Sequence, residues 1–147
     1  MRDVRLLETG FDPAAELAGF AHAHPEAGGI ASFVGQVRAG QGVTALELSH
    51  YAPLTLPGME QLADEALSRF DLMGLQLIHR VGQMTPGDPI VSVCAAARHR
   101  RDAIAAVDFA MDHLKGDAWF WKRELRAGEW HWIEPREQDR DDLARWK

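Results

Sequence analysis

The sequence predicts a single α+β domain in which antiparallel sheets are packed against three helices. Apolar residues recur in three stretches with the spacing of an amphipathic helix, and pairs of short β-rich runs separate these stretches. Paired strands between helices favour antiparallel hairpins over the alternating order of a parallel sheet. A length of 147 residues suits one domain with a hydrophobic core of its own.

The expected order of elements is β-α-β-β-α-β-β-α-β-β, followed by a charged tail. In chain order the elements are a strand at 4–8, a helix from Asp12 to before Pro25, strands at 30–38 and 43–51, a helix at 59–70, strands at 75–81 and 90–97, a helix at 102–116, strands at 119–125 and 129–133, and the tail at 135–147.

In the first half of the chain, local chemistry sets each boundary. Asp12 is a helix N-cap with Pro13 at the first helical position. The glycine-rich turn at 39–42 is expected to bring the strand at 43–51 back beside the one before it. Residues 52–58 contain two prolines and a glycine, which predicts a loop.

In the second half, turn residues again separate the elements. The segment Thr-Pro-Gly-Asp-Pro at 85–89 predicts an antiparallel hairpin between the two β-rich runs that it joins. Gly116 is a natural helix C-cap, and Ala127-Gly128 is the expected turn of a last hairpin. The tail is charged and is expected either to be mobile or to dock on a partner.

Composition excludes several classes of protein. The longest apolar stretch, 93–97, is too short to span a bilayer, and Glu8 and Asp12 interrupt any signal peptide, so a cytoplasmic protein is expected. A net charge of −6 argues against general nucleic-acid binding. With Cys94 as the single cysteine and no His-x-x-x-His pair, no metal site is expected.

Lysine is rare in this chain. Of sixteen Lys and Arg residues, the lysines are Lys115, Lys122 and the C-terminal Lys147. Arginine stays protonated near neutral pH, whereas a partly buried lysine can lose its proton and act as a base or nucleophile. Two lysines around an aromatic run therefore suggest chemistry. The alternative is a helix-terminal cation for Lys115 and a strand cation extending past tryptophans for Lys122.

Further cations are expected to surround these lysines. Arg38 ends a strand, and Arg98, His99 and Arg100 lie where a strand leads into a helix. The free N–H groups of a helix N-terminus add to the charge of such side chains, so this junction is suited to a phosphate. We therefore expect one cationic pocket with lysine at its centre.

Five motifs stand in a fixed order along the chain. They are Phe33-x-Gly35-x-Val37-Arg38, His79-Arg80-x-Gly82, Pro86-Gly87-Asp88, His99-Arg100, and Met111-Asp112-x-Leu114-Lys115 followed by Phe120-Trp121-Lys122-Arg123-Glu124. Each motif alone is weak. Together, over nearly the whole chain, they resemble the large, catalytic subunit of molybdopterin synthase, the MoaE family.

The resemblance implies a sulfurtransferase of molybdenum cofactor biosynthesis with an α/β hammerhead-like fold. The family installs the dithiolene sulfurs of molybdopterin on cyclic pyranopterin monophosphate and needs no cofactor of its own. Each sulfur arrives as a thiocarboxylate on the C-terminal Gly-Gly tail of a small ubiquitin-like subunit. Two large subunits form a central homodimer, and one small subunit at each end completes a heterotetramer.

The resemblance also implies roles for particular residues. Lys115 and Lys122 are the catalytic lysines, with Lys115 nearest the thiocarboxylate, and Arg136 matches an arginine that enters the neighbouring subunit's pocket. Residues implied to bind the substrate are Gln36, Val37, Arg38, His99, Arg100, Lys115, Lys122, Arg123, Glu124 and Arg136.

Two segments depart from the family pattern, namely the short turn at 39–42 and the long connection at 51–59. They put the fit to a standard small subunit in question. Two other functions remain as alternatives. One is a module of the same fold that docks a ubiquitin-like tail without catalysis, and the other is an unrelated lyase that forms a Schiff base on lysine.

Overall fold

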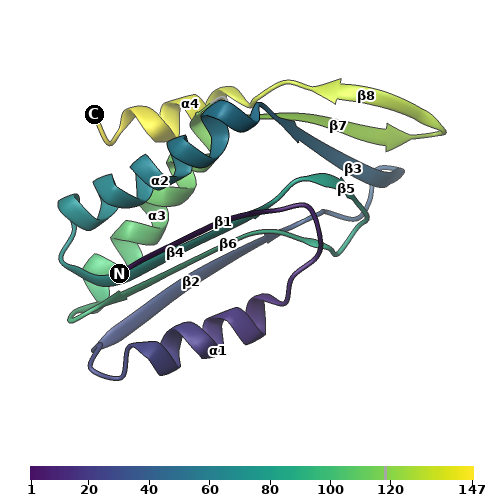
Figure 1. Cartoon of the computed structure of the whole chain (residues 1–147). Helices are drawn as coiled ribbons and strands as arrows, with labels where there is room; N and C mark the ends of the chain where they lie inside the picture. The colour runs from purple at the N-terminus through teal and green to yellow at the C-terminus, as the bar shows by residue number, and fades with distance from the viewer. Residues whose placement is uncertain (118) are drawn as a thin grey trace.

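The computed structural model describes residues 1–117 and 119–147, which form two four-stranded sheets. In the first sheet, β1 runs parallel to β4 at one edge and the other pairs are antiparallel. Its strand order is β1 (Arg2–Leu7), β4 (Leu72–Arg80), β6 (Pro89–Ala97) and β2 (Gly29–Gln36) (Figure 1).

The second sheet is antiparallel throughout and extends beyond the helices as an arm (Figure 1). Its strand order is β5 (Gly82–Met84), β3 (Val43–His50), β7 (Phe120–Arg126) and β8 (Glu129–Ile133). The short strand β5 follows β4 almost directly, so the chain passes from the first sheet to the second at this point.

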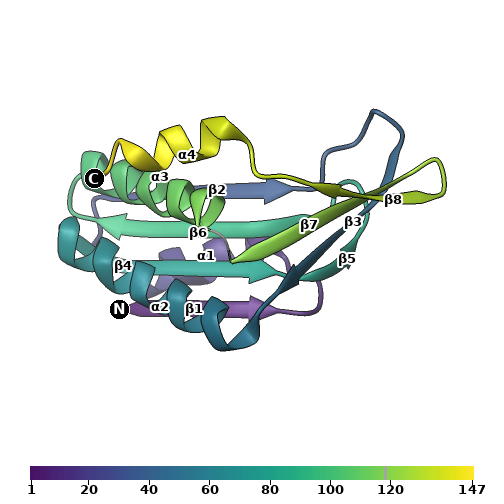
Figure 2. The ribbon, with the colours of Figure 1, turned by 90° about the horizontal axis from the view of Figure 1, so that it is seen from above.

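Helices cover both faces of the first sheet. One face packs against α1 (Pro13–Ala23), and the other against α2 (Ala52–Arg69) and α3 (Arg100–Gly116), as the two views in Figures 1 and 2 show. A further helix, α4 (Glu137–Ala144), lies against α3. None of the helices in the described part of the chain is long and apolar enough to cross a membrane.

The main core lies between the first sheet and the pair α2–α3. Met59 of α2, Leu75 and Leu77 of β4, and Val93 of β6 are all fully buried there, with Phe109 of α3. A second cluster fills the junction of the two sheets, and Phe120 at the start of β7 packs against it. The residues of this second cluster are Val37, Leu46, Leu48, Val81, Met84 and Ile90.

Several predictions from the sequence are confirmed. The fold is α+β, the Asp12 side chain caps α1 by accepting from the N–H groups of Ala14 and Ala15, and β4 pairs with β6 in antiparallel register. The last hairpin, β7–β8, turns at Ala127 and Gly128, and both residues have positive φ. Two positive φ angles suit the twist of a tight hairpin.

The loop predicted at 52–58 is wrong, because α2 begins at Ala52. Pro53 lies in the first turn, where a backbone N–H would have no intrahelical partner. Pro57 lies inside the helix and removes one hydrogen bond from it. The Thr55 hydroxyl bonds to the Tyr51 carbonyl at 3.1 Å and to the Trp119 carbonyl at 3.4 Å, which ties this turn to the chain before β7.

The hairpin predicted between 30–38 and 43–51 is also wrong. Strand β2 pairs with β6 in the first sheet, whereas β3 pairs with β5 and β7 in the second. Backbone hydrogen bonds at the end of β2 explain why β2 does not pair with β3. The Val37 N–H donates to Asp88 and the Val37 carbonyl accepts from Gly87, so this segment follows the 85–88 turn rather than folding back.

The described residues contain four helices instead of the predicted three, because the tail at 135–147 holds α4. Leu143 on this helix is buried against α3. Charged residues fill the exposed side of α4, so its sequence lacks the apolar periodicity from which an amphipathic helix is predicted.

Candidate active site

Lys115 and Lys122 come together at one end of the molecule. Lys115 lies in the last turn of α3 and Lys122 lies near the start of β7, after a short connection. The pKa of Lys115 is lowered from its ordinary value, first because surrounding protein atoms desolvate its ammonium and second because Lys122 repels it. The side chain still keeps an exposed surface in this single chain. The site is therefore accessible and strongly cationic.

Strand alternation places Lys122 and Phe120 on the same face of β7. Lys122 pairs with Leu48 and Ile133, and Phe120 packs into the junction of the two sheets. The Phe120 ring stacks on His79, with ring centroids 4.0 Å apart and planes inclined by 14°. This stack forms an apolar floor next to the lysines.

His79 is a neutral residue in this floor that the sequence did not single out as functional. Its Nδ1–H donates to the Arg80 carbonyl at 2.9 Å. Burial lowers the pKa of His79 to about 3, against the opposing effect of this hydrogen bond, and the charges of Lys115 and His50 lower it further. The signal available in the sequence was a histidine inside a buried apolar strand.

Helix α4 adds a charged pair to the site. The Arg136 guanidinium donates to the Asp139 carboxylate at 3.0 Å. The Asp139 charge raises the pKa of Lys115 and the Arg136 charge lowers it, so both groups lie within electrostatic reach of that lysine. Arg136, expected in a neighbouring subunit's pocket, thus also lies near Lys115 of its own chain.

The predicted segment Gln36 to Arg38 lines a cavity of about 390 Å³ with Ala39 and the Pro86–Gly87 turn. Val37 is buried in the junction cluster against which Phe120 packs. Val37 therefore belongs both to the lining of this cavity and to the cluster that contacts Phe120.

Arg123 and Glu124, predicted with Lys122 as a continuous binding segment, lie on opposite faces of β7. The Arg123 guanidinium donates to Glu47 at 2.9 Å and lies 4.3 Å from the centre of the Trp130 ring. The Arg123 side chain therefore points away from Lys122, and only Glu124 shares the lysine face.

The prediction of one pocket containing His99, Arg100 and the lysines is wrong for a single chain. His99 is the N-cap of α3 and Arg100 its first residue, whereas Lys115 lies in its last turn. Fifteen residues at 1.5 Å each separate Arg100 from Lys115 by about 22 Å. A straight helix thus holds the two cationic groups apart.

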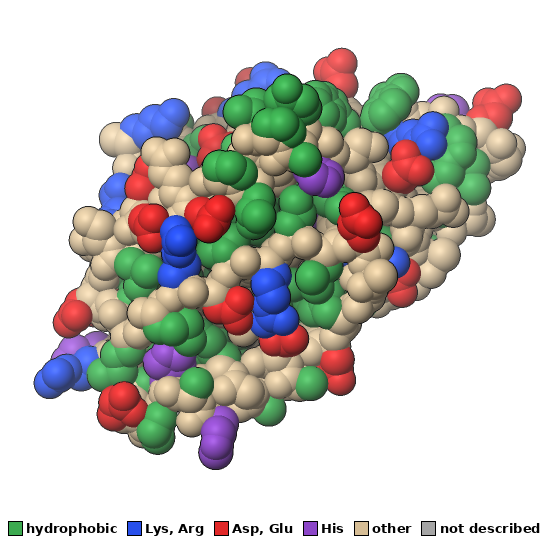
Figure 3. Space-filling view, in the orientation of Figure 1, with side chains coloured by type: hydrophobic (Ala, Val, Ile, Leu, Met, Phe, Trp, Pro, Cys, Tyr) green, Lys and Arg blue, Asp and Glu red, His purple; other side chains and the backbone are tan. Residues whose placement is uncertain are grey.

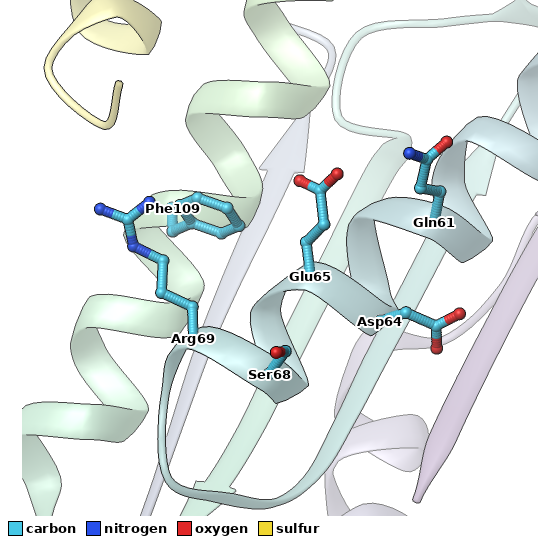
Figure 4. Close-up of a pocket in the computed structure, with 6 residues that line it drawn as sticks. All are labelled: Gln61, Asp64, Glu65, Ser68, Arg69 and Phe109. Carbon is cyan, nitrogen blue, oxygen red and sulfur yellow. The ribbon is translucent and has the colours of Figure 1, made fainter.

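Another cavity, of about 450 Å³, lies between α2 and α3 and holds none of the predicted residues (Figure 4). Phe109 comes from α3 and the other lining residues from α2, namely Gln61, Asp64, Glu65, Ser68 and Arg69. No group of three His, Cys, Asp or Glu in the described part of the chain could hold a metal ion.

Large hydrophobic side chains are exposed close to the lysine end. Figure 3 shows them gathered above the first turns of α2 and along the β7–β8 arm. The exposed residues of these elements are Tyr51, Leu54, Leu56, Trp121 and Trp132. Their exposure suits a surface that another protein covers.

Comparison with known proteins points to one family. The sequence profile described as MoaE protein matches residues 7–117. A molybdopterin synthase catalytic subunit from Ralstonia nicotianae is 42% identical over 149 aligned residues, covering 99% of this chain and 85% of that protein.

Two solved structures have a fold similar to that of this chain. A molybdopterin cofactor biosynthesis protein E from Burkholderia multivorans has a TM-score of 0.83 and 42% identity, covering 99% of this chain and 97% of that one. A complex of subunits 1 and 2 of molybdopterin-converting factor from Helicobacter pylori shares only the fold, at TM-score 0.79, 18% identity, and coverage of 90% and 91%. The extent of these matches shows that the chain belongs to the MoaE family.

Proposed function

We propose that this chain is the catalytic subunit of a molybdopterin synthase. It transfers sulfur from the thiocarboxylated C-terminus of a small ubiquitin-like subunit to cyclic pyranopterin monophosphate and so forms the dithiolene of molybdopterin. Family membership supports this function, as does the name of the Ralstonia nicotianae relative. The observation that carries the proposal is the meeting of Lys115 and Lys122, two of the three lysines in the chain, at one accessible end of the fold.

The two lysines are suited to different tasks. Lys115, whose pKa is lowered, can be deprotonated at a lower pH than an ordinary lysine. It orients and activates the thiocarboxylate carbonyl, and Lys122 moves protons at the carbons that receive sulfur. The neutral His79–Phe120 stack keeps this floor apolar, which strengthens electrostatic interactions above it.

The phosphate of the substrate needs fixed cations, and His99, Arg100 and the N-terminus of α3 provide them. They lie about 22 Å from Lys115 in the same chain, which is too far for one small substrate. A second copy of this chain therefore brings its His99 and Arg100 to the lysines of the first. This arrangement makes the homodimer necessary for a complete site.

The small subunit covers the hydrophobic surface above α2 and along β7–β8, from which its C-terminal tail reaches the lysines. The Helicobacter pylori complex of similar fold likewise contains two different subunits. The enzyme acts in the cytoplasm, binds no cofactor of its own and has pyranopterin as its substrate.

A single-turnover assay tests this function. The protein, a thiocarboxylated small subunit and cyclic pyranopterin monophosphate are mixed, and molybdopterin is followed as its fluorescent oxidation product. Product is expected to vanish in Lys115→Ala and to fall sharply in Lys122→Ala, while Lys147→Ala behaves as wild type.

Other outcomes would contradict the proposal. Tight binding of the small subunit without any product would favour a docking module without catalysis. Trapping of a carbonyl substrate on Lys115 or Lys122 by borohydride would favour a Schiff-base lyase.

A further inference from the structure

The C-terminal segment packs closely against α3 directly beside Lys115. A Cβ added to Gly116, the next residue, would lie 2.7 Å from Leu143 Cδ2 and 3.2 Å from the Asp139 carbonyl oxygen. Leu143 is buried in this contact. Helix α4 therefore approaches α3 at a point where only glycine fits.

The end of the same segment is held mainly by the Asp112 carboxylate, and Arg145 Nη2 also lies 2.6 Å from Asp108 Oδ2. Asp112 Oδ2 accepts hydrogen bonds from Arg145 Nε at 3.0 Å, from Arg145 Nη2 at 2.7 Å and from Trp146 Nε1 at 2.5 Å. The Asp112 side chain is only 13% exposed. We call Asp112, Arg145 and Trp146 the C-terminal latch.

Aromatic packing supports the latch. The Trp146 ring meets Phe109 and Phe70 edge-on, with centroids 5.3 and 6.1 Å apart. The Arg69 guanidinium lies 5.3 Å from the Trp146 ring and donates to the Trp146 carbonyl at 3.0 Å. These contacts fix the chain end on α2 and α3.

The latch and the lysine site share the last turns of α3. Asp112 and Lys115 are three residues apart and thus lie on neighbouring positions of one helix face. At the other end of α4, Arg136 and Asp139 act on the charge of Lys115. This segment lies beyond residues 7–117, the part matched by the family profile.

We propose that Asp112, Arg145 and Trp146 are positioning residues, which hold α4 so that its first turn forms one wall of the Lys115 site. The expected effect of the latch on catalysis rests on the proposed function, whereas its expected effect on the pKa of Lys115 does not. The charged and titratable groups around Lys115 are Lys122 from β7, His79 from β4, and Asp139 and Arg136 from α4. Release of α4 also removes the Asp139 charge, which raises the pKa of Lys115, and the Arg136 charge, which lowers it. Desolvation is the largest influence on this pKa, so its partial loss is expected to raise the pKa of Lys115 toward the ordinary value.

The test uses the full chain with two latch variants and one control. Trp146→Phe keeps an aromatic ring but removes the Nε1–H donor, and Asp112→Asn weakens the acceptor. Asp141→Asn is the matched control, because it removes the same charge from an exposed position on α4.

Competitive acetylation over a range of pH, with a lysine-containing reference peptide, gives the titration midpoint of Lys115 by peptide mapping. Three lysines make the mapping unambiguous. The midpoint should lie below that of Lys147 in wild type and in Asp141→Asn, and should rise toward it in both latch variants. Amide exchange across 137–144 should speed up by about 10-fold or more in the latch variants, with β4 and β6 unchanged.

An unchanged Lys115 midpoint in both latch variants would overturn the proposal, whatever happens to exchange in α4. In single turnover, the latch variants should lose roughly 10- to 100-fold in rate, as small displacements at a reacting centre do. If wild type forms no molybdopterin, the proposed function fails, and the acetylation result still decides the latch.

Discussion

At the scale of single residues, Lys115 has a lowered pKa because burial desolvates its ammonium and because Lys122 repels it. We expect the single-turnover rate to rise with pH and to level off below pH 10.5, since the lowered pKa yields the neutral amine earlier. Lys115→Arg should be as inactive as Lys115→Ala, because arginine keeps the charge but not the titration. Activity in Lys115→Arg equal to wild type would contradict a role for the neutral amine.

His79 should make folding stability depend on pH. Its pKa is about 3 when folded and about 6.5 when unfolded, so the unfolded state binds the proton first and stability falls as pH drops below 6.5. At pH 5 this loss amounts to about 2 kcal/mol relative to pH 7. Urea unfolding at both pH values should show this loss in wild type and a smaller one in His79→Gln. Equal losses in the two proteins would refute this assignment.

Features of the candidate site that depend on residue type could be predicted from the sequence. Features that depend on the direction in which a side chain points could not. Two lysines in an arginine-rich chain suggested the candidate site, because their rarity is visible in the sequence. Arg123 was grouped with Lys122 by proximity in sequence, yet successive strand residues face opposite sides. The environment of His79 arises from contacts with β7 and α3, which the sequence does not display.

At the scale of elements, the contact between α3 and α4 can be tested with a pair of glycines. Gly116→Ala should destabilise the protein by about 1–3 kcal/mol, because the new methyl group would overlap Leu143. Gly19→Ala in α1 meets nothing within 4 Å and should stabilise by up to about 1 kcal/mol, since alanine favours a helix. Thermal unfolding of both variants measures the difference, and two shifts of the same sign would contradict the close α4 contact.

The elements most visible in the sequence were those set by local turn chemistry. The β4–β6 pairing followed from the turn at 85–89, and the β7–β8 hairpin from Ala127-Gly128. The start of α2 was missed because prolines were taken as loop formers although the first turn of a helix tolerates them. The move of β3 into the second sheet depends on pairing with β7, more than seventy residues later.

At the scale of the whole molecule, α3 separates the lysines from His99 and Arg100, the proposed phosphate-binding residues, by its own length. In the proposed function, each chain then holds two half-sites at opposite ends of one helix. The extent of α3 could be predicted from sequence to within two residues, whereas the proposed need for a second copy follows only from the distance between its two ends. Dilution below the dissociation constant of the homodimer should therefore abolish activity while each chain stays folded, which circular dichroism at the same concentrations would check.

The most direct test of a site shared between two copies is to mix Lys115→Ala with Arg100→Ala after confirming that each alone forms no molybdopterin. Random reassociation makes half of the dimers mixed, and each mixed dimer has one site with both residues intact. We predict recovery of about a quarter of the wild-type single-turnover amplitude. No recovery, despite demonstrated exchange of subunits, would show that Lys115 and Arg100 do not act across two copies of this chain.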